Sequence, residues 1–220
     1  MNATAPLAHS SKTKLLDAAL KVIRSKGYSA TKLDDVCAAA GVTKGSFFHH
    51  FSGKEDLALA AVKHWNEVTG ALFAAAPYQQ VADPRERILA YIDFRAQIVQ
   101  GDLADVTCLL GTMVQETFDS HPAIRAGCQE GIEGHARTLV PMIDEAKALY
   151  APLADWDAEI LALYTQAALQ GAFIIAKAQG DSAIAPQLIA HLHSYIKGLL
   201  TPSTFNLKLH TTGAVHAKTL

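Results

Sequence analysis

The chain has little of what marks several classes of protein. Its 220 residues include three cysteines, Cys37, Cys108 and Cys128, which are too few and too odd in number for a disulfide framework. No run of about 18 apolar residues occurs, so we expect no helix that crosses a membrane. Residues 1–11 have no basic start followed by an apolar stretch, so we expect no secretory signal. These absences predict a cytoplasmic protein in a reducing compartment.

Sequence patterns that carry catalysis are also absent. The chain has no glycine-rich phosphate loop, no GxSxG pattern and no pair of carboxylates beside a candidate nucleophile. His49 and His50 are adjacent, and His191 and His193 are two residues apart, so neither pair has the spacing that a helical metal site needs. We therefore expect no enzyme activity, no cofactor and no metal site.

Half of the residues are hydrophobic and 18% are charged, so the chain can bury a substantial core and is not disordered over most of its length. The apolar residues recur at helical spacing, without strand-type alternation and without a repeat of roughly 20 to 50 residues. These patterns predict an all-α fold of about nine helices. We expect an N-terminal domain over residues 1–53, a second domain over 54–200 and a tail of low order over 201–220.

The net charge is unevenly distributed along the chain. Residues 1–65 contain nine lysines and arginines and five aspartates and glutamates, a net charge of +4, whereas the remainder carries a net charge of −6. A basic N-terminal region on an acidic body suggests that this region meets a polyanion. A chance fluctuation of this size is the alternative.

Three short helices are predicted within the N-terminal domain. Apolar residues at helical spacing predict a first helix that begins near Ser10 and ends at Gly27. We expect Thr31 and Asp34 to form a capping box for a second helix, and Thr43 to cap a third. Two short helices joined by a tight turn that contains glycine form a helix-turn-helix unit. The alternative is a small three-helix core whose polar groups simply face solvent.

The third helix has a composition that suits contact with DNA. Phe47 and Phe51 lie four residues apart and can face the first two helices, which leaves the other side chains outside. Gly45 would let the backbone approach a surface closely, and Lys44 can bond a phosphate or a guanine edge. Phe48 can pack on a sugar or a thymine methyl group.

The segment GYSATKLDDVCAAAGVTKGSFFHHFSGKEDL at residues 27–57 resembles the N-terminal DNA-binding domain of TetR/AcrR-family transcriptional regulators. The matching features are the Ala30-Thr31 entry, the AGV turn at 40–42 and TKGSFFHHF at 43–51. Phe48 stands where the family very often has tyrosine, so a phosphate hydrogen bond from that ring is lost or replaced by packing.

The resemblance implies a homodimer that binds a palindromic double-stranded operator, usually as a repressor, and an all-α body that binds a small-molecule effector. It implies that the residues facing the major groove are Lys44, Gly45, Ser46, Phe48 and His49. It implies that the residues gripping the DNA backbone are Thr31, Lys32, Thr43 and Lys54. An activator remains an alternative, as does an all-α small-molecule-binding protein or enzyme with a vestigial helix-turn-helix.

Apolar stripes between proline and glycine breaks predict the helices of the second domain. Pro141 should kink or split one of them. The helix over 157–178 is apolar on much of its circumference, so it can serve both the core and a subunit contact, although a purely intramolecular role is the alternative. The predicted helices cover 54–75, a segment from Pro84 to about 99, 103–118, 122–149, 157–178 and 185–200.

An effector pocket should lie between the central helices, and its mainly apolar candidates suit a small, fairly hydrophobic ligand. Gln115, Glu116 or Gln166 could add polar recognition. The context VTCLLGTMVQE around Cys108 resembles one branch of the family, in which some members sense electrophiles or oxidants through a cysteine; simple packing is the alternative. The candidate lining residues are Tyr91, Phe94, Arg95, Cys108, Met113, Phe118, Tyr164 and Phe173.

Overall fold

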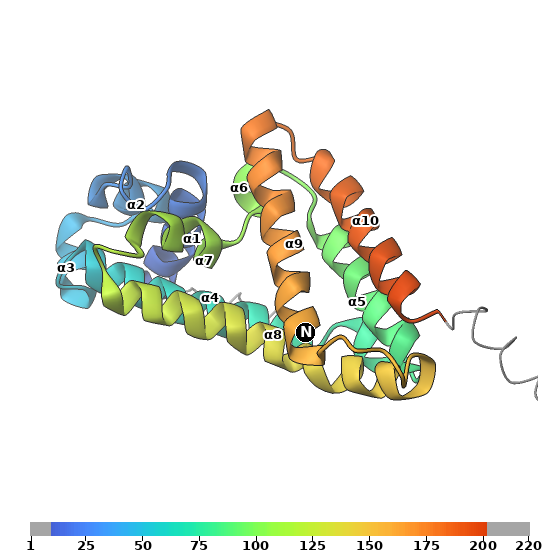
Figure 1. The fold of residues 1–220 in the computed structure, drawn as a ribbon. Helices are drawn as coiled ribbons and strands as arrows, with labels where there is room; N and C mark the ends of the chain where they lie inside the picture. The colour runs from blue at the N-terminus through green and yellow to red at the C-terminus, as the bar shows by residue number, and fades with distance from the viewer. Residues whose placement is uncertain (1–9, 202–220) are drawn as a thin grey trace, which may run out of the picture.

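The structure is a computed structural model that describes residues 10–201. Over this range it is all-helical, with no strand, and so it confirms the predicted fold class (Figure 1). The predicted tail at 201–220 lies outside the described residues, apart from Thr201. The helices are α1 (Ser11–Lys26), α2 (Leu33–Ala40), α3 (Lys44–His50), α4 (Lys54–Ala74), the 3-10 helix η1 (Pro77–Gln80), α5 (Pro84–Ile98), α6 (Leu103–Val106), α7 (Leu109–Thr117), α8 (Pro122–Tyr150), α9 (Ala158–Gln179) and α10 (Ile184–Leu199).

The caps of α1 and α3 are those that the sequence predicts. The Ser10 hydroxyl accepts a hydrogen bond from the Thr13 N–H at 3.2 Å, and the Thr43 hydroxyl accepts one from the Ser46 N–H at 3.2 Å. Each cap satisfies an N–H group that the first helical turn leaves free. The beginnings of both helices are therefore fixed by local sequence.

The capping box predicted for α2 is wrong by one residue. The Thr31 hydroxyl donates to the Gly27 carbonyl at 2.6 Å, so it ties the loop to the end of α1. The Lys32 N–H donates to the Asp35 carboxylate at 3.1 Å, and Asp34 does not take this role. Because Thr31 is buried and used within the loop, α2 begins one residue later than the sequence suggests.

The predicted single helix over 103–118 is also wrong, since the chain breaks between α6 and α7. Thr107 and Cys108 have extended backbone conformations. Val106 packs into the hydrophobic core formed around α5, α9 and α10, whereas Leu109 packs into the core formed around α1–α3. Val106 and Leu109 are three residues apart, so a continuous α-helix of 3.6 residues per turn would turn both towards nearly the same face and could not direct them into different cores.

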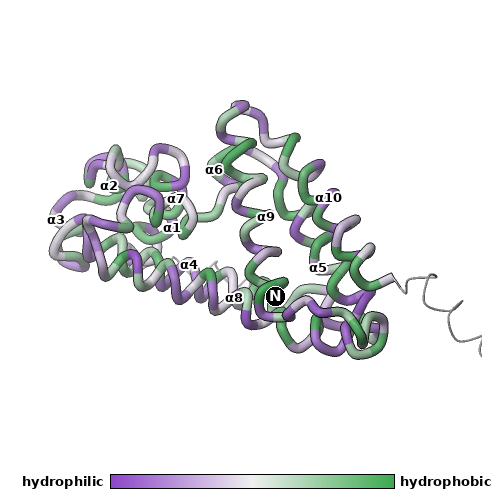
Figure 2. Tube along the Cα trace, viewed as in Figure 1, coloured by the Kyte–Doolittle hydropathy of each residue, from purple (hydrophilic) through white to green (hydrophobic). Residues whose placement is uncertain are grey.

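Two long helices join the parts of the molecule. Helices α4 and α8 pack side by side and extend from α1–α3 towards α5, α9 and α10 (Figure 1). Helix α8 continues through Pro141, so of the predicted kink or split the split does not occur; the neighbouring Leu139, Met142 and Ile143 are buried. Hydrophilic and hydrophobic positions alternate along α8, as in a helix with one face in solvent (Figure 2).

Each of the two hydrophobic cores gathers one part of the molecule, here called the head and the body. The head core takes side chains from α1–α3, the first half of α4, α7 and the start of α8. The body core takes side chains from the end of α4, α5, the second half of α8, α9 and α10. The predicted boundary at 53/54 falls on the α3–α4 link, while the head core continues past it into later helices.

Candidate DNA-binding surface and effector cavity

Helix α3 presents a small and exposed outer face. Phe47 and Phe51 are 0% and 3% exposed and pack inward against α1 and α2, as their spacing predicts. Gly45 is exposed, and a Cβ built there would meet only the Thr43 hydroxyl oxygen, at 3.8 Å. Phe48 is 56% exposed. The backbone of α3 is thus open to close approach by another surface.

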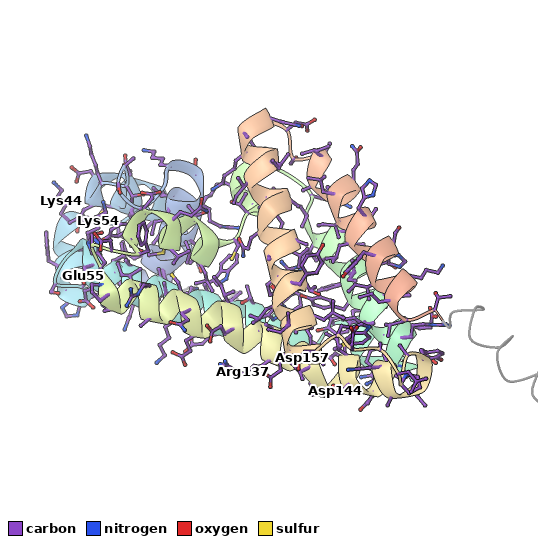
Figure 3. The ribbon with its side chains drawn as sticks, in the orientation of Figure 1. Lys44, Lys54, Glu55, Arg137, Asp144 and Asp157 are labelled. Carbon is purple, nitrogen blue, oxygen red and sulfur yellow. The ribbon has the colours of Figure 1, made fainter. Side chains whose placement is uncertain are left out.

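Lys44 lies at the outer end of the head, on the first turn of α3 (Figure 3). Its ammonium group forms a 2.8 Å ion pair with Asp34 of α2. The hydrogen bond to Asp34 raises the pKa of Lys44. Both side chains are more than half exposed, so solvent screens the pair and a phosphate can compete for the lysine. Lys32 and His49 are also exposed on the head.

Lys54 and Thr31 are engaged within the head. The Lys54 ammonium group donates to the Ser29 carbonyl at 3.0 Å and lies 4.4 Å from the centre of the Tyr28 ring. Partial burial lowers the pKa of Lys54. The Thr31 hydroxyl is 3% exposed and bonds the end of α1. The structure therefore gives these two residues a role in holding the α1–α2 loop.

A carboxylate from α7 also holds this loop. Glu116 accepts hydrogen bonds from the backbone N–H groups of Tyr28, at 3.2 Å, and Ser29, at 2.7 Å. Gly27 makes this approach possible, because a Cβ at that position would overlap with the Glu116 carboxylate. Glu116 was expected as a candidate for effector recognition, but it lies at the head and not on the cavity described next.

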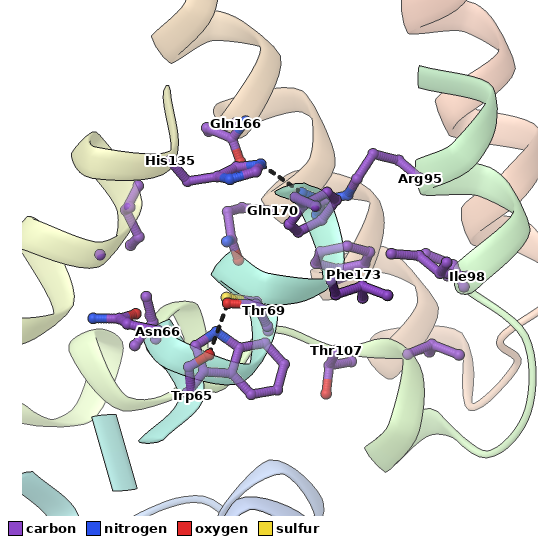
Figure 4. A pocket seen from close by; sticks show the side chains of 18 of the residues that line it. Trp65, Asn66, Thr69, Arg95, Ile98, Thr107, His135, Gln166, Gln170 and Phe173 are labelled. Atoms are coloured by element: carbon purple, nitrogen blue, oxygen red, sulfur yellow. Dashed lines mark hydrogen bonds between the residues drawn. The ribbon is translucent and has the colours of Figure 1, made fainter. Parts of the chain in front are cut away.

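A cavity of about 270 Å³ lies between the head and the body. Its walls come from α4, α5, α8, α9 and the α6–α7 link (Figure 4). Of the predicted pocket residues, Arg95, Cys108 and Phe173 line it, and so does Gln166. Sequence reasoning missed most of the other lining residues, among them Trp65, Asn66, Thr69, Phe73, Thr107, His135 and Gln170.

The remaining predicted pocket residues lie elsewhere. Tyr91 is fully buried behind the cavity wall, and Phe94 packs against Phe73 and Tyr78. Met113 belongs to the head core, because the break before α7 turns that helix towards α1. Phe118 is 60% exposed after the end of α7. Tyr164 is 47% exposed on α9, with its ring 5.2 Å from that of Tyr195 on α10.

Four polar side chains form a connected network on one cavity wall. The Tyr91 hydroxyl lies 2.9 Å from Nε2 of His135 and receives hydrogen bonds from Gln166, at 3.1 Å, and Arg95, at 3.3 Å. Burial, assisted by the positive charge of Arg95, lowers the pKa of His135 to about 3. The histidine is therefore neutral at physiological pH.

Helices α9 and α10 share an apolar outer face. Ile174, Ile175 and Tyr164 of α9 and Tyr195 of α10 are each more than 40% exposed, and all four line a shallow groove between the two helices. Among residues 10–201, α9 alone is long and apolar enough to cross a membrane, by length and composition only, although 44% of that stretch is buried within the protein. The core helix of a soluble protein meets the same description.

The described residues show no cluster suited to a metal ion. Between residues 10 and 201, no three side chains of His, Cys, Asp or Glu come together in this way, and all three cysteines are free thiols. Cys37 is buried in the head core, as its position on the apolar stripe of α2 predicts. Cys128 is fully buried there as well, and burial raises its pKa to about 12.

Sequence comparison identifies relatives for most of the chain. Residues 15–61 match the profile described as "Bacterial regulatory proteins, tetR family", and residues 84–192 match "Tetracyclin repressor-like, C-terminal domain". The transcriptional regulator AcuR of Cereibacter sphaeroides is 30% identical over 173 residues, which cover 79% of this chain and 78% of the relative. The regulator CymR of Pseudomonas putida is 33% identical over 121 residues, covering 54% and 57% of the two chains.

Solved structures agree with these relatives. A TetR regulatory protein from Rhodobacter sphaeroides superposes with a TM-score of 0.74 at 25% identity, covering 84% of this chain and 97% of that one. A TetR regulator from Chloroflexus aurantiacus gives 0.73 at 25% identity, covering 85% and 94%. The relatives are transcriptional regulators and not enzymes, in agreement with the sequence-based expectation. The chain belongs to the TetR family of bacterial transcriptional regulators.

Proposed function

We propose that the protein is a cytoplasmic repressor that binds a palindromic double-stranded operator as a homodimer and leaves it when a small, mainly hydrophobic effector fills the cavity. The exposed outer face of α3 carries this proposal. A helix that shows a glycine, a lysine and an exposed aromatic ring to solvent fits the major groove, where side chains reach base edges. Lys44, Gly45, Ser46, Phe48 and His49 are the proposed groove contacts.

The proposed backbone contacts are Lys32, Thr43 and Lys54, together with the N–H groups near Thr31. Lys54 would have to share its ammonium group between the Ser29 carbonyl and a phosphate, which three donors on one nitrogen allow. Lys44 would exchange Asp34 for DNA. Since each lysine that neutralises a phosphate releases a counterion, operator affinity should fall steeply with salt.

The apolar face of α9 and α10 is the proposed dimer contact. Exposed Ile174 and Ile175 lie over the groove between the two helices, and a second copy packed there would form a four-helix interface. In the proposed dimer the two α3 helices would enter successive major grooves, about 34 Å apart or a multiple of that.

Helix α7 supports a connection between effector and DNA. Its N-terminal end adjoins Thr107 and Cys108, which line the cavity, and Glu116 near its other end holds the α1–α2 loop. An effector that binds one arrangement of this helix more tightly would change the separation of the two heads. Binding to the operator then weakens, because the half-site spacing no longer fits.

A gel-shift titration with DNA from upstream of the protein's own gene tests the proposal. We expect a retarded complex whose affinity falls with salt, and Lys44→Ala should weaken it. Arg137→Ala on α8, far from α3 in Figure 3, is the matched control and should leave binding unchanged. Absence of salt-sensitive binding, or equal loss in both variants, would contradict a DNA-binding role for α3. Sedimentation of the free protein as a monomer would contradict the dimer.

A further inference from the structure

Two buried side-chain polar atoms in the described part of the chain have no hydrogen-bond partner. They are Nε of Arg95 and the hydroxyl oxygen of Thr107. Both residues line the cavity, and they are 8% and 2% exposed. Buried polar groups in folded proteins are nearly always paired, because an unpaired one loses its water without compensation. Their common location therefore indicates a polar occupant of this cavity.

Arg95 also lacks a counterion within residues 10–201. Asp105 is the acidic residue on the cavity wall, and it pairs with Arg24 at 3.8 Å. The Arg95 guanidinium instead lies 5.2 Å from the ring centre of Phe73 and 5.9 Å from that of Phe173. Aromatic faces compensate a buried positive charge only in part. The cavity thus holds one uncompensated positive charge against apolar walls.

The hydrogen-bond acceptors around Arg95 are neutral, namely the Tyr91 hydroxyl oxygen and Nε2 of His135, which lies 3.4 Å from Nη1 of Arg95. Arg95 and Gln166 both donate to the Tyr91 hydroxyl, so the single proton of Tyr91 is donated to Nε2 of His135. His135 is then neutral and carries its own proton on Nδ1. No member of this network bears a negative charge that could neutralise Arg95.

We infer that the cavity binds a small monocarboxylate with an apolar body, whose carboxylate pairs with Arg95. The inference rests on the proposed function, in which this cavity receives the effector. One unpaired guanidinium matches one carboxylate, and Nε supplies a charge-assisted hydrogen bond. The apolar body lies among Phe73, Phe173 and the other apolar side chains of the wall, and the Thr107 hydroxyl donates to a further oxygen of the ligand. Figure 4 shows Arg95, Thr107 and Phe173 around the cavity. A cavity of about 270 Å³ limits this ligand to a small size.

Isosteric pairs of probes test the charge directly. Hexanoate and hexanamide, or benzoate and benzamide, differ in charge and hardly in shape. We expect the carboxylates at millimolar concentration to raise the Tm of the full-length protein, because a ligand of the native state stabilises it by mass action. The amides should bind at least roughly tenfold more weakly in calorimetry, since they lose a hydrogen bond between charged groups.

Substitutions of two arginines on α5 test whether the carboxylate binds at Arg95. Arg95→Gln should abolish the preference for carboxylate, and Arg95→Lys should keep it at lower affinity. Arg87→Gln is the matched control, because Arg87 bonds the Val81 carbonyl at 2.7 Å and pairs with Glu145 away from the cavity. Thr107→Val, close to isosteric, should leave the preference for carboxylate over amide unchanged, because these probes have no oxygen beyond the carboxylate. Circular dichroism of each variant verifies its fold.

Three outcomes would overturn the inference: no response to either carboxylate, equal responses to acid and amide, or an unchanged carboxylate response in Arg95→Gln. Gel shifts with the same preparations keep this separate from the proposed function. A protein that binds operator DNA but ignores carboxylates refutes the ligand and leaves the regulator intact. A protein that binds carboxylates but no DNA refutes the regulator and leaves the ligand site.

Discussion

Gly27 and Glu116 meet where α1 ends, and substitutions there test how the head is joined to α7. Gly27 has φ 85° and ψ 164°, a region that residues other than glycine enter at a cost of about 1–3 kcal/mol. An alanine Cβ would also overlap with the Glu116 carboxylate and push it from the N–H groups of Tyr28 and Ser29. Losing these partly exposed bonds costs about 1–2 kcal/mol. Gly27→Ala should therefore lower the free energy of unfolding by about 3 kcal/mol.

Gly41→Ala is the matched control for backbone strain. Gly41 has φ 64° and ψ 37°, and nothing lies within 4 Å of the Cβ position. Gly41→Ala should therefore lower the free energy of unfolding only by the cost of a left-handed backbone conformation at a residue other than glycine, about 1–2 kcal/mol. Urea unfolding measures each variant, with the midpoint and slope fitted together.

A double-mutant cycle with Glu116→Ala identifies the contact. Alone, Glu116→Ala should cost about 1–2 kcal/mol. In the Gly27→Ala background it should cost almost nothing more, because the carboxylate is already displaced and its removal also relieves the overlap. If the effects of the two substitutions on the free energy of unfolding were strictly additive, this account of the contact between Gly27 and Glu116 would be refuted. Operator release by an effector should also weaken in Glu116→Ala, while affinity in the absence of effector is retained.

The remaining predictions concern the DNA surface, the dimer and pH. Lys44→Ala should lower operator affinity roughly tenfold to hundredfold and relax specificity at one base pair. Lys54→Ala should weaken binding to every sequence and, because the dimer carries two copies of Lys54, reduce the slope of log affinity against log salt by about 1.8; an unchanged slope would remove its phosphate role. Ile175→Glu should give a monomer in sedimentation, and a stable dimer would contradict the assigned face. The pKa of His135 is lowered to about 3 in the folded protein, so as the pH falls the histidine is protonated in the unfolded chain before it is protonated in the folded one. Stability should thus fall by up to about 1.4 kcal/mol per pH unit below pH ~6.5, and His135→Gln should lose this dependence.

Local signals in the sequence predicted most of the helices and the exposed outer face of α3. The caps at Ser10 and Thr43 depend on side chains within three residues, so their patterns are readable without a tertiary structure. The same locality explains why Phe47 and Phe51 were assigned inward correctly. Thr31 misled the prediction of a cap because its hydroxyl had a tertiary alternative, the carbonyl at the end of α1.

The cavity depended on contacts that periodicity cannot show. Trp65 and His135 lie on long helices, and the sequence pattern of each helix indicates only one face in solvent and one face in the core. The packing of α4 against α8 places both side chains on the wall of the same cavity. Cys108 has no basic neighbour in sequence, whereas the fold brings Arg24 and Lys177 within electrostatic range of its side chain. The signal that could have found the site was Arg95, an arginine on a predicted apolar face with no acidic partner at helical spacing.

The break between α6 and α7, which the sequence did not reveal, connects the proposed effector cavity to the head. Val106 is held by the body core and Leu109 by the head core, and between them Cys108 packs against both cores. Thr107 and Cys108 form part of the cavity wall. Helix α7 has nine residues, and a helix of that length extends roughly 13 Å. A ligand that bonds Thr107 therefore acts on one end of a short rigid element whose other end, through Glu116, fixes the loop before α2 and α3. In the proposed mechanism α7 carries the conformational preference of the ligand to the loop before α2, which is why we expect loosening at Glu116 to weaken effector-driven release of the operator before it weakens DNA binding.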